Sequence, residues 1–185
     1  MNPAPADSAS EADAALVARV VATDDRAAFE LLVRRHQSPL RNFLRRLTRQ
    51  DTALADDLSQ EAFVRAYRSL ASFRGEASFQ TWLYQIAYRV FLNDKRVRHA
   101  DTEFDESVHS PTVDRKTIRD DLVDIERALG KLTIRQQAVF DLHYRKGMTH
   151  FEVASALQLP LGTVKSDLRR GCAQLKTMLD SQEPN

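Results

Sequence analysis

The fold is decided by the stretch Met148–Leu179, which reads MTHFEVASALQLPLGTVKSDLRRGCAQLKTML. Thr149 and Glu152 have the spacing of a capping box, which predicts that a short helix starts there. Pro160 fits the first turn of a second helix, where its missing N–H costs nothing. A short helix, a tight turn and a longer helix together predict a helix-turn-helix.

The second helix of this pair has an apolar face and a basic face. Val164, Leu168 and Leu175 follow the helical period and should be buried. The opposite arc carries Lys165, Ser166, Arg169 and Arg170. This pattern favours a helix that reads DNA, and the alternative is an amphipathic hairpin with a solvated basic face.

Asp167 stands among these basic residues, and three interpretations of it remain open. Asp167 is a flank residue at which a phosphate contact is lost, an acceptor for cytosine N4, or a clamp that positions Arg170. Gln158 stands in the turn, where a small residue is more usual, so the turn is expected to be less tight. The single cysteine, Cys172, is expected to be a small buried apolar group.

Upstream, the apolar positions predict three more helices. From Phe29 to Leu47 they follow a 3.6-residue period, and Pro39 is expected to kink or divide that helix. A second helix is expected after the acidic start Asp56–Asp57, and a third from Phe79 to about residue 98. The segment FRGEAS, residues 73–78, should form the loop between them.

We therefore predict an all-α fold of two small helical domains. A flexible N-terminal segment should cover residues 1–24 and a first domain residues 25–99. Residues 100–121 lack helical periodicity, contain Pro111 and are acidic, so a flexible linker is expected there. The second domain, residues 122–180, should begin with a helix marked by Leu122, Ile125, Leu129 and Leu132.

The net charge of +1 hides blocks of opposite sign. Residues 26–100 carry fourteen basic and seven acidic side chains, whereas residues 101–121 carry three and seven. A basic block of this size indicates either a polyanion-binding face or a solvated helical surface.

Several classes of function find no support in the sequence. The five histidines lack metal-ligand spacing, one cysteine cannot complete a zinc site, and no phosphate-binding glycine loop is present. We find no catalytic constellation, so neither an enzyme nor a cofactor is expected. The acidic first residues do not resemble a signal peptide and no stretch suits membrane insertion, so a cytoplasmic protein is predicted.

Two motifs resemble one family. PLGTVKSDLRR resembles the PxGTVKSRLxR signature in the C-terminal domain of bacterial sigma factors, and DDLSQEAFVRAYRSLASFRGEASFQTWLYQIAYR resembles their N-terminal core domain. The two-domain size is similar to the extracytoplasmic-function (ECF, group IV) class of the sigma-70 family. The resemblance implies a factor that binds the β′ and β subunits of core RNA polymerase, recognises promoter −35 and −10 elements and promotes DNA melting.

The resemblance also implies roles for individual residues. Polymerase binding falls to Asp57, Gln60, Glu61 and Phe63, although Phe63 also suits the core. Recognition and melting of the −10 element fall to Phe73, Arg74, Gly75, Trp82, Tyr88, Arg89, Asn93 and Arg96, with Trp82 equally suited to the core. Recognition of the −35 element falls to Thr163, Lys165, Ser166, Arg169 and Arg170.

The sequence departs from the family pattern at Arg89, where asparagine is common, and at Asp167, where arginine is usual. An anti-sigma factor is a further expected partner. Two alternatives are a sigma-mimicking protein that sequesters an anti-sigma factor and a free-standing helix-turn-helix regulator. The second would leave the DDLSQEAF and FRGEASFQTWL matches unexplained.

Overall fold

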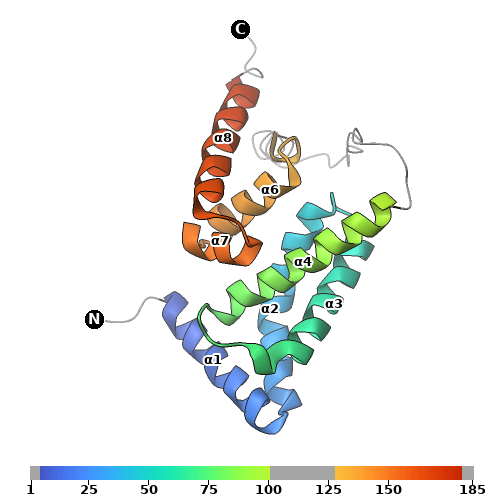
Figure 1. The fold of residues 1–185 in the computed structure, drawn as a ribbon, viewed down its shortest axis with the longest axis vertical. Coiled ribbons are helices and arrows are strands. Elements are labelled where there is room, and N and C mark those ends of the chain that lie inside the picture. The colour runs from blue at the N-terminus through green and yellow to red at the C-terminus, as the bar shows by residue number, and fades with distance from the viewer. Residues whose placement is uncertain (1–4, 101–127, 181–185) are drawn as a thin grey trace, which may run out of the picture. The chain divides into compact units, whose positions relative to one another are not determined.

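The structure, a computed structural model, describes residues 5–100 and 128–180, and every regular element in these two ranges is a helix (Figure 1). This confirms the predicted all-α fold. The chain divides into two compact units, one built mainly from residues 1–96 and the other mainly from residues 97–185. The predicted linker, apart from its first residue, and the start of the following helix at Leu122 and Ile125 lie outside the described residues.

The first unit consists of four α-helices and a short 3-10 helix. They are α1 (Pro5–Thr23), α2 (Arg26–Leu47), α3 (Thr52–Ser69), η1 (Leu70–Ser72) and α4 (Phe79–Ala100). Helix α2 runs without a break through Pro39, so of the two expected effects, a kink or a division, the division does not occur. Its buried residues include Leu32, Leu40 and Phe43, and Phe43 meets Tyr84 of α4 edge-on with ring centroids 5.1 Å apart.

Helix α1 corrects the expectation of a flexible segment at residues 1–24. Leu16, Val17 and Val20 form a short apolar stripe that is buried, and α1 packs along α2. The buried carboxylate of Asp13 pairs with Arg35 and lies 2.7 Å from Nε2 of His36, both on α2. Asp13, Leu16, Val17 and Val20 therefore anchor α1 on α2.

A capping residue sets the start of α3. The Asp51 carboxylate accepts a hydrogen bond from Leu54 N, so α3 begins at Thr52, ahead of the predicted acidic start at Asp56. Asp56 instead forms an ion pair with Arg41 of α2, whose Nε lies 2.9 Å from Oδ1 of Asp56. Residues 73–78 form the predicted loop, and Gly75 adopts a left-handed φ of +72° there.

The described part of the second unit includes α6 (Ile134–Phe140), the π-helical turn η2 (Asp141–Arg145), α7 (His150–Leu157) and α8 (Leu161–Asp180). Thr149 and Glu152 form the predicted capping box: Thr149 N donates to Glu152 Oε2 at 2.8 Å and Glu152 N donates to Thr149 Oγ1 at 3.3 Å. A second capping box, Thr133 with Gln136, starts α6. The unit therefore contains the predicted helix-turn-helix, α7 followed by α8.

The turn between α7 and α8 is built on Gln158, which has a left-handed φ of +55°. Gln158 N donates to Ser155 O, and Leu159 N donates to Ala154 O. These two bonds define a Schellman cap, whose left-handed position is usually glycine. The turn thus keeps its tight geometry with glutamine, contrary to the expectation of a looser one, and α8 begins directly after Pro160.

Candidate functional site

Helix α8 presents the basic face that the sequence predicts. Val164 and Leu168 are buried against the rest of the second unit, whereas Lys165, Arg169 and Arg170 are exposed. An exposed row of cations on a docked helix is suited to phosphates and to base edges in a major groove.

The first turns of α8 hold two polar side chains in place. Ser166 is half-buried, donates to Thr163 O at 3.0 Å and accepts a hydrogen bond from Arg170 Nη2 at 3.3 Å. Thr163 is also half-buried, and its backbone N–H donates to Pro160 O. Arg170 is thus positioned by Ser166 within the same helix.

Asp167 lies on the packed side of α8, away from the basic face. Its side chain is only 2% exposed and faces α6, where Arg135 donates from Nε to Oδ2 at 2.7 Å and from Nη2 to Oδ1 at 3.2 Å. A carboxylate buried and engaged on both oxygens is not an acceptor for cytosine and does not clamp Arg170. Its position away from the basic face agrees with the interpretation in which a phosphate contact is lost. Sequence reasoning missed Arg135 because the two residues are 32 positions apart.

Cys172 is exposed, which corrects the expectation of a buried thiol. The packed stripe of α8 follows Val164, Leu168 and Gly171, and Cys172 falls at its edge. Its sulfur lies 3.5 Å from the hydroxyl of Tyr144, and this contact raises the pKa of Tyr144 above its ordinary value of 10.0.

The loop before α4 carries an aromatic cluster. Phe73 and Trp82 are half-buried with ring centroids 5.2 Å apart, and both lie near the buried ring of Phe79. Beside them, Arg74 and Gly75 are exposed. Trp82 is therefore shared between the core and the surface, and the cluster offers a partly open aromatic edge next to a cation.

The structure corrects the expectation that Tyr88 contacts the −10 element, because its side chain is buried and is not available to a base. It lies on the inner face of α4 with Tyr84, Ala87 and Phe91, and its ring stacks on that of Phe91 at 6.3 Å. Its position four residues after Tyr84 places it on the core side of the helix.

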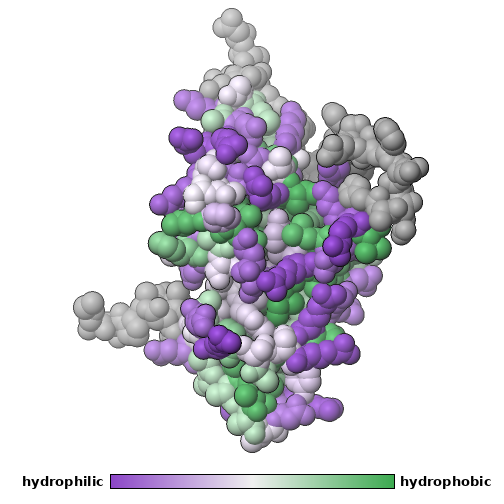
Figure 2. Space-filling view, in the orientation of Figure 1, coloured by the Kyte–Doolittle hydropathy of each residue, from purple (hydrophilic) through white to green (hydrophobic). Residues whose placement is uncertain are grey.

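The outer face of α4 carries polar side chains beside the exposed apolar side chains of Leu92 and Val97. Arg89, Asn93 and Arg96 are exposed, and Arg98 lies on the same half of the helix. Figure 2 shows hydrophilic side chains along the C-terminal half of α4. This half of α4 supplies cations and an amide to one side of the first unit.

Helix α3 presents the residues expected to bind a protein partner. Asp57, Gln60 and Glu61 are exposed, and Glu61 pairs with Arg65 one turn later at 2.6 Å. Phe63 is 8% exposed and belongs mainly to the core. Val64 is 47% exposed; sequence reasoning missed it, although its spacing from Gln60 and Glu61 places it beside them.

The remaining edge of Phe63 lines a hollow between α2 and α3 of about 470 Å³. Phe29, Val64 and Tyr67 line it with Phe63, and Arg26 and Arg68 stand at its rim. The hydroxyl of Tyr67 bonds to the Asp24 carboxylate, which raises the pKa of Tyr67 above its ordinary value of 10.0. The hollow continues the exposed face of α3 towards the start of α2.

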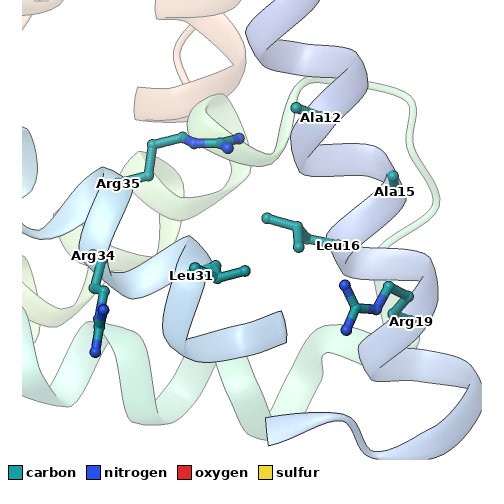
Figure 3. Close-up of a pocket in the computed structure, with 7 residues that line it drawn as sticks. All are labelled: Ala12, Ala15, Leu16, Arg19, Leu31, Arg34 and Arg35. Atoms are coloured by element: carbon teal, nitrogen blue, oxygen red, sulfur yellow. The ribbon is translucent and has the colours of Figure 1, made fainter. Parts of the chain in front are cut away.

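A larger groove of about 650 Å³ lies between α1 and α2 (Figure 3). Leu16 of α1 and Leu31 of α2 point toward one another across it, and Arg19, Arg34 and Arg35 border it. Each of these arginines pairs with a carboxylate of the same unit, namely Asp25, Glu30 and Asp13. The groove is therefore apolar at its centre and nearly balanced in charge at its edge.

Two further features of the described part of the chain bear on function. Within residues 5–100 and 128–180, no group of three or more His, Cys, Asp or Glu side chains is arranged to hold a metal ion. Among the helices in the same ranges, none combines the length and the apolar character that crossing a membrane requires.

Comparison with known proteins gives two family matches in chain order. Residues 32–100 match the model for sigma-70 region 2, and residues 122–175 match the model for sigma-70, region 4. The RNA polymerase sigma-H factor of Pseudomonas aeruginosa is 33% identical over 175 residues, covering 86% of this chain and 90% of that protein. The ECF RNA polymerase sigma factor SigM of Mycobacterium tuberculosis is 35% identical over 168 residues, covering 90% and 84%.

A solved structure is similar over most of the chain. The sigma factor RpoE of Bartonella quintana, in complex with the anti-sigma factor NepR, has 25% identity and a TM-score of 0.67. The match covers 84% of this chain and 98% of that one.

Proposed function

This chain belongs to the sigma-70 family as a sigma factor of the ECF class, and we propose how its two helical units share promoter recognition. It is an alternative sigma factor that directs RNA polymerase to promoters. The observation that carries the proposal is the exposed basic face of α8, opposite its buried Val164 and Leu168, in a chain that also has the region 2 helices.

The −35 element is read by α8. Lys165, Arg169 and Arg170 project from the helix, and Ser166 holds Arg170 near Thr163. Arginine and lysine contact guanine edges and phosphates, so these side chains supply both base recognition and grip. Thr163, at the start of the helix, is placed to contact a phosphate beside the groove.

The −10 element is bound by the loop at residues 73–78 and the outer face of α4. The aromatic edges of Phe73 and Trp82 offer a surface on which an unstacked base can stack, a contact worth about 1–3 kcal/mol. Arg74 and Gly75 flank this surface, while Arg89, Asn93 and Arg96 contact the backbone and base edges along α4. Because arginine pairs well with guanine, we expect the promoter base that Arg89 contacts to be preferentially guanine.

Core polymerase docks on α3. Asp57, Gln60 and Glu61 form an exposed acidic and amide face, which suits a basic helical partner on the β′ subunit. Val64 adds an apolar contact beside them, and the edge of Phe63 closes the neighbouring hollow. The β subunit of core polymerase is a further proposed partner.

Three further proposals follow from the family. An anti-sigma factor is a partner, supported by the similarity to a sigma factor solved with one. We also propose that the chain catalyses no reaction itself and leaves nucleotide addition to the polymerase. Because it acts on promoters, we propose that it works in the bacterial cytoplasm, where the DNA is.

The test of this division of labour is reconstitution of the full chain with core polymerase, followed by footprinting on promoters that the holoenzyme selects. Gln60→Ala/Glu61→Ala should weaken assembly with core, whereas Lys165→Ala/Arg169→Ala should assemble normally and lose protection of the −35 element only. If both double variants assemble and protect DNA like the wild type, the assignment of these faces is wrong. A holoenzyme that forms but protects no promoter would favour a sigma-mimicking decoy.

A further inference from the structure

The polar pair Asp167–Arg135 joins the reader helix to α6 inside the second unit. Asp167 is buried, and the planar guanidinium of Arg135 engages both of its carboxylate oxygens. A two-pronged bond of this kind fixes orientation as well as distance, unlike a contact between a carboxylate and a lysine.

The position of Asp167 on the helix relates it to the DNA-facing residues. Asp167 is two positions from both Lys165 and Arg169, which places it about 200° around the helix from each of them. It therefore lies on the docked side when they point outward, and the observed exposures agree. A rotation of α8 about its axis would break the bond with Arg135 and turn the two cations away from their present direction.

The same turn of α6 makes a second polar contact with α8. Gln136 is fixed by the capping box with Thr133, and its amide nitrogen donates to Gln174 Oε1 at 3.4 Å. Asp167 and Gln174 are seven residues, or about two turns, apart on α8. Arg135 and Gln136, which are adjacent on α6, thus contact α8 at two points about two turns apart.

The buried apolar residues of α8 alone would define its rotation and register less specifically. Val164 and Leu168 make apolar contacts, which are non-directional and tolerate small rotations and slides. Replacing a buried ion pair by apolar groups often leaves stability unchanged, whereas polar pairs are well suited to fixing one register. The function of this pair is therefore better sought in geometry than in stability.

We propose that Asp167 and Arg135 are positioning residues that set the rotation of α8 and so aim Lys165 and Arg169 at the −35 element. This inference rests on the proposed reading of promoter DNA by α8. It explains the departure from the PxGTVKSRLxR signature, because the arginine that the signature has at this place would here face the guanidinium of Arg135. In this chain the signature residue should therefore be harmful unless Arg135 changes with it.

The experiment measures discrimination by the full chain in holoenzyme with core polymerase. The two templates are a promoter selected by the wild-type holoenzyme and the same promoter with a scrambled −35 element, and discrimination is the ratio of their transcription. Asp167→Arg and Arg135→Asp should each lower this ratio roughly tenfold, and the double swap Asp167→Arg/Arg135→Asp should restore it to within about threefold of wild type. Arg135→Lys keeps the positive charge but loses the two-pronged guanidinium, so its discrimination ratio should lie between that of the wild type and those of the two single variants.

Controls separate positioning from folding. Asp167→Asn is almost isosteric, so it keeps the helix packed and should still lower discrimination while thermal unfolding and assembly with core change little. The inference is overturned if folded single variants discriminate like the wild type, or if the double swap restores thermal stability without restoring discrimination. A wild-type holoenzyme that does not distinguish the two templates would instead overturn the proposed −35 function, and this inference with it.

Discussion

Asp25 caps α2 from the turn that joins it to α1. Its carboxylate accepts a hydrogen bond from Ala28 N at 3.0 Å and pairs with Arg19 at 2.6 Å. The bond from the backbone amide, followed by the bond from Arg19, lowers the pKa of Asp25 below its ordinary value of 3.8. A group whose pKa is lower in the folded than in the unfolded chain stabilises the fold when it is ionised.

The expected consequence is a stability difference that depends on pH. The contribution of Asp25 is fully present above pH 3.8 and is lost as the pH falls through the lower folded-state value. Asp25→Ala should therefore be less stable than the wild type at neutral pH, and the gap should narrow in acid. Urea unfolding of both proteins over a pH series checks this, and a gap that stays constant into strong acid would contradict it.

Gln158 occupies a left-handed backbone position that is usually taken by glycine. Its φ of +55° is costly for side chains branched at Cβ. Gln158→Val should destabilise the fold by about 1 kcal/mol or more, whereas Ser155→Val, at an exposed helical position nearby, should change it by less than about 0.5 kcal/mol. Equal losses in urea unfolding would show that the left-handed turn carries no strain.

At the scale of elements, the approach of α8 to α6 depends on Gly171. A Cβ atom built there would lie 2.4 Å from Cε2 of Phe140, whose ring is buried and packs near Tyr144. The ring therefore has to move to admit even one methyl group. This contact lies one turn beyond Asp167 and helps to set how closely the reader helix docks.

Gly171→Ala should destabilise the second unit by about 1–3 kcal/mol through overpacking. Gly162 is the matched control, because it lies in the same helix with nothing within 4 Å of a built Cβ. Gly162→Ala should be neutral or stabilising by about 0.5 kcal/mol. Chemical denaturation of the two variants decides the matter, and a neutral Gly171→Ala would mean that Phe140 moves aside freely.

The elements also show what local sequence can predict. The period of α2, the loop at residues 73–78 and the capping box at Thr149 depend on neighbours within a turn, and all three match the structure. Helix α1 was missed because its ordering depends on α2: Asp13 meets its partners Arg35 and His36 more than twenty positions later. Composition alone does not reveal such a partner.

In the candidate site, too, local sequence predicts some features, and contacts between helices determine the others. Periodicity correctly placed Lys165, Arg169 and Arg170 on the exposed face of α8, and a resemblance supplied their proposed role. The burial of Tyr88 and the pairing of Asp167 with Arg135 depend on which side of each helix is packed against its neighbours. That information becomes available only when the helices are assembled.

The whole molecule combines two sets of exposed surfaces in one chain. The first unit has the exposed acidic and amide face of α3 and an aromatic edge with cations, and the second has the exposed basic face of α8. We propose that these surfaces bind polymerase and promoter DNA. Neither set suffices alone, because a reader helix without polymerase contacts would be an ordinary DNA-binding protein. The central claim is therefore that this chain makes core polymerase start at specific promoters.

The measurement that tests this claim most directly is in vitro transcription by core RNA polymerase on a pooled promoter library, with and without the full chain. The account predicts transcripts that appear only with the chain, share a −35 and a −10 motif, and fall with both Gln60→Ala/Glu61→Ala and Lys165→Ala/Arg169→Ala. An unchanged transcript set on adding the chain, with core polymerase active on a control sigma factor, would contradict it.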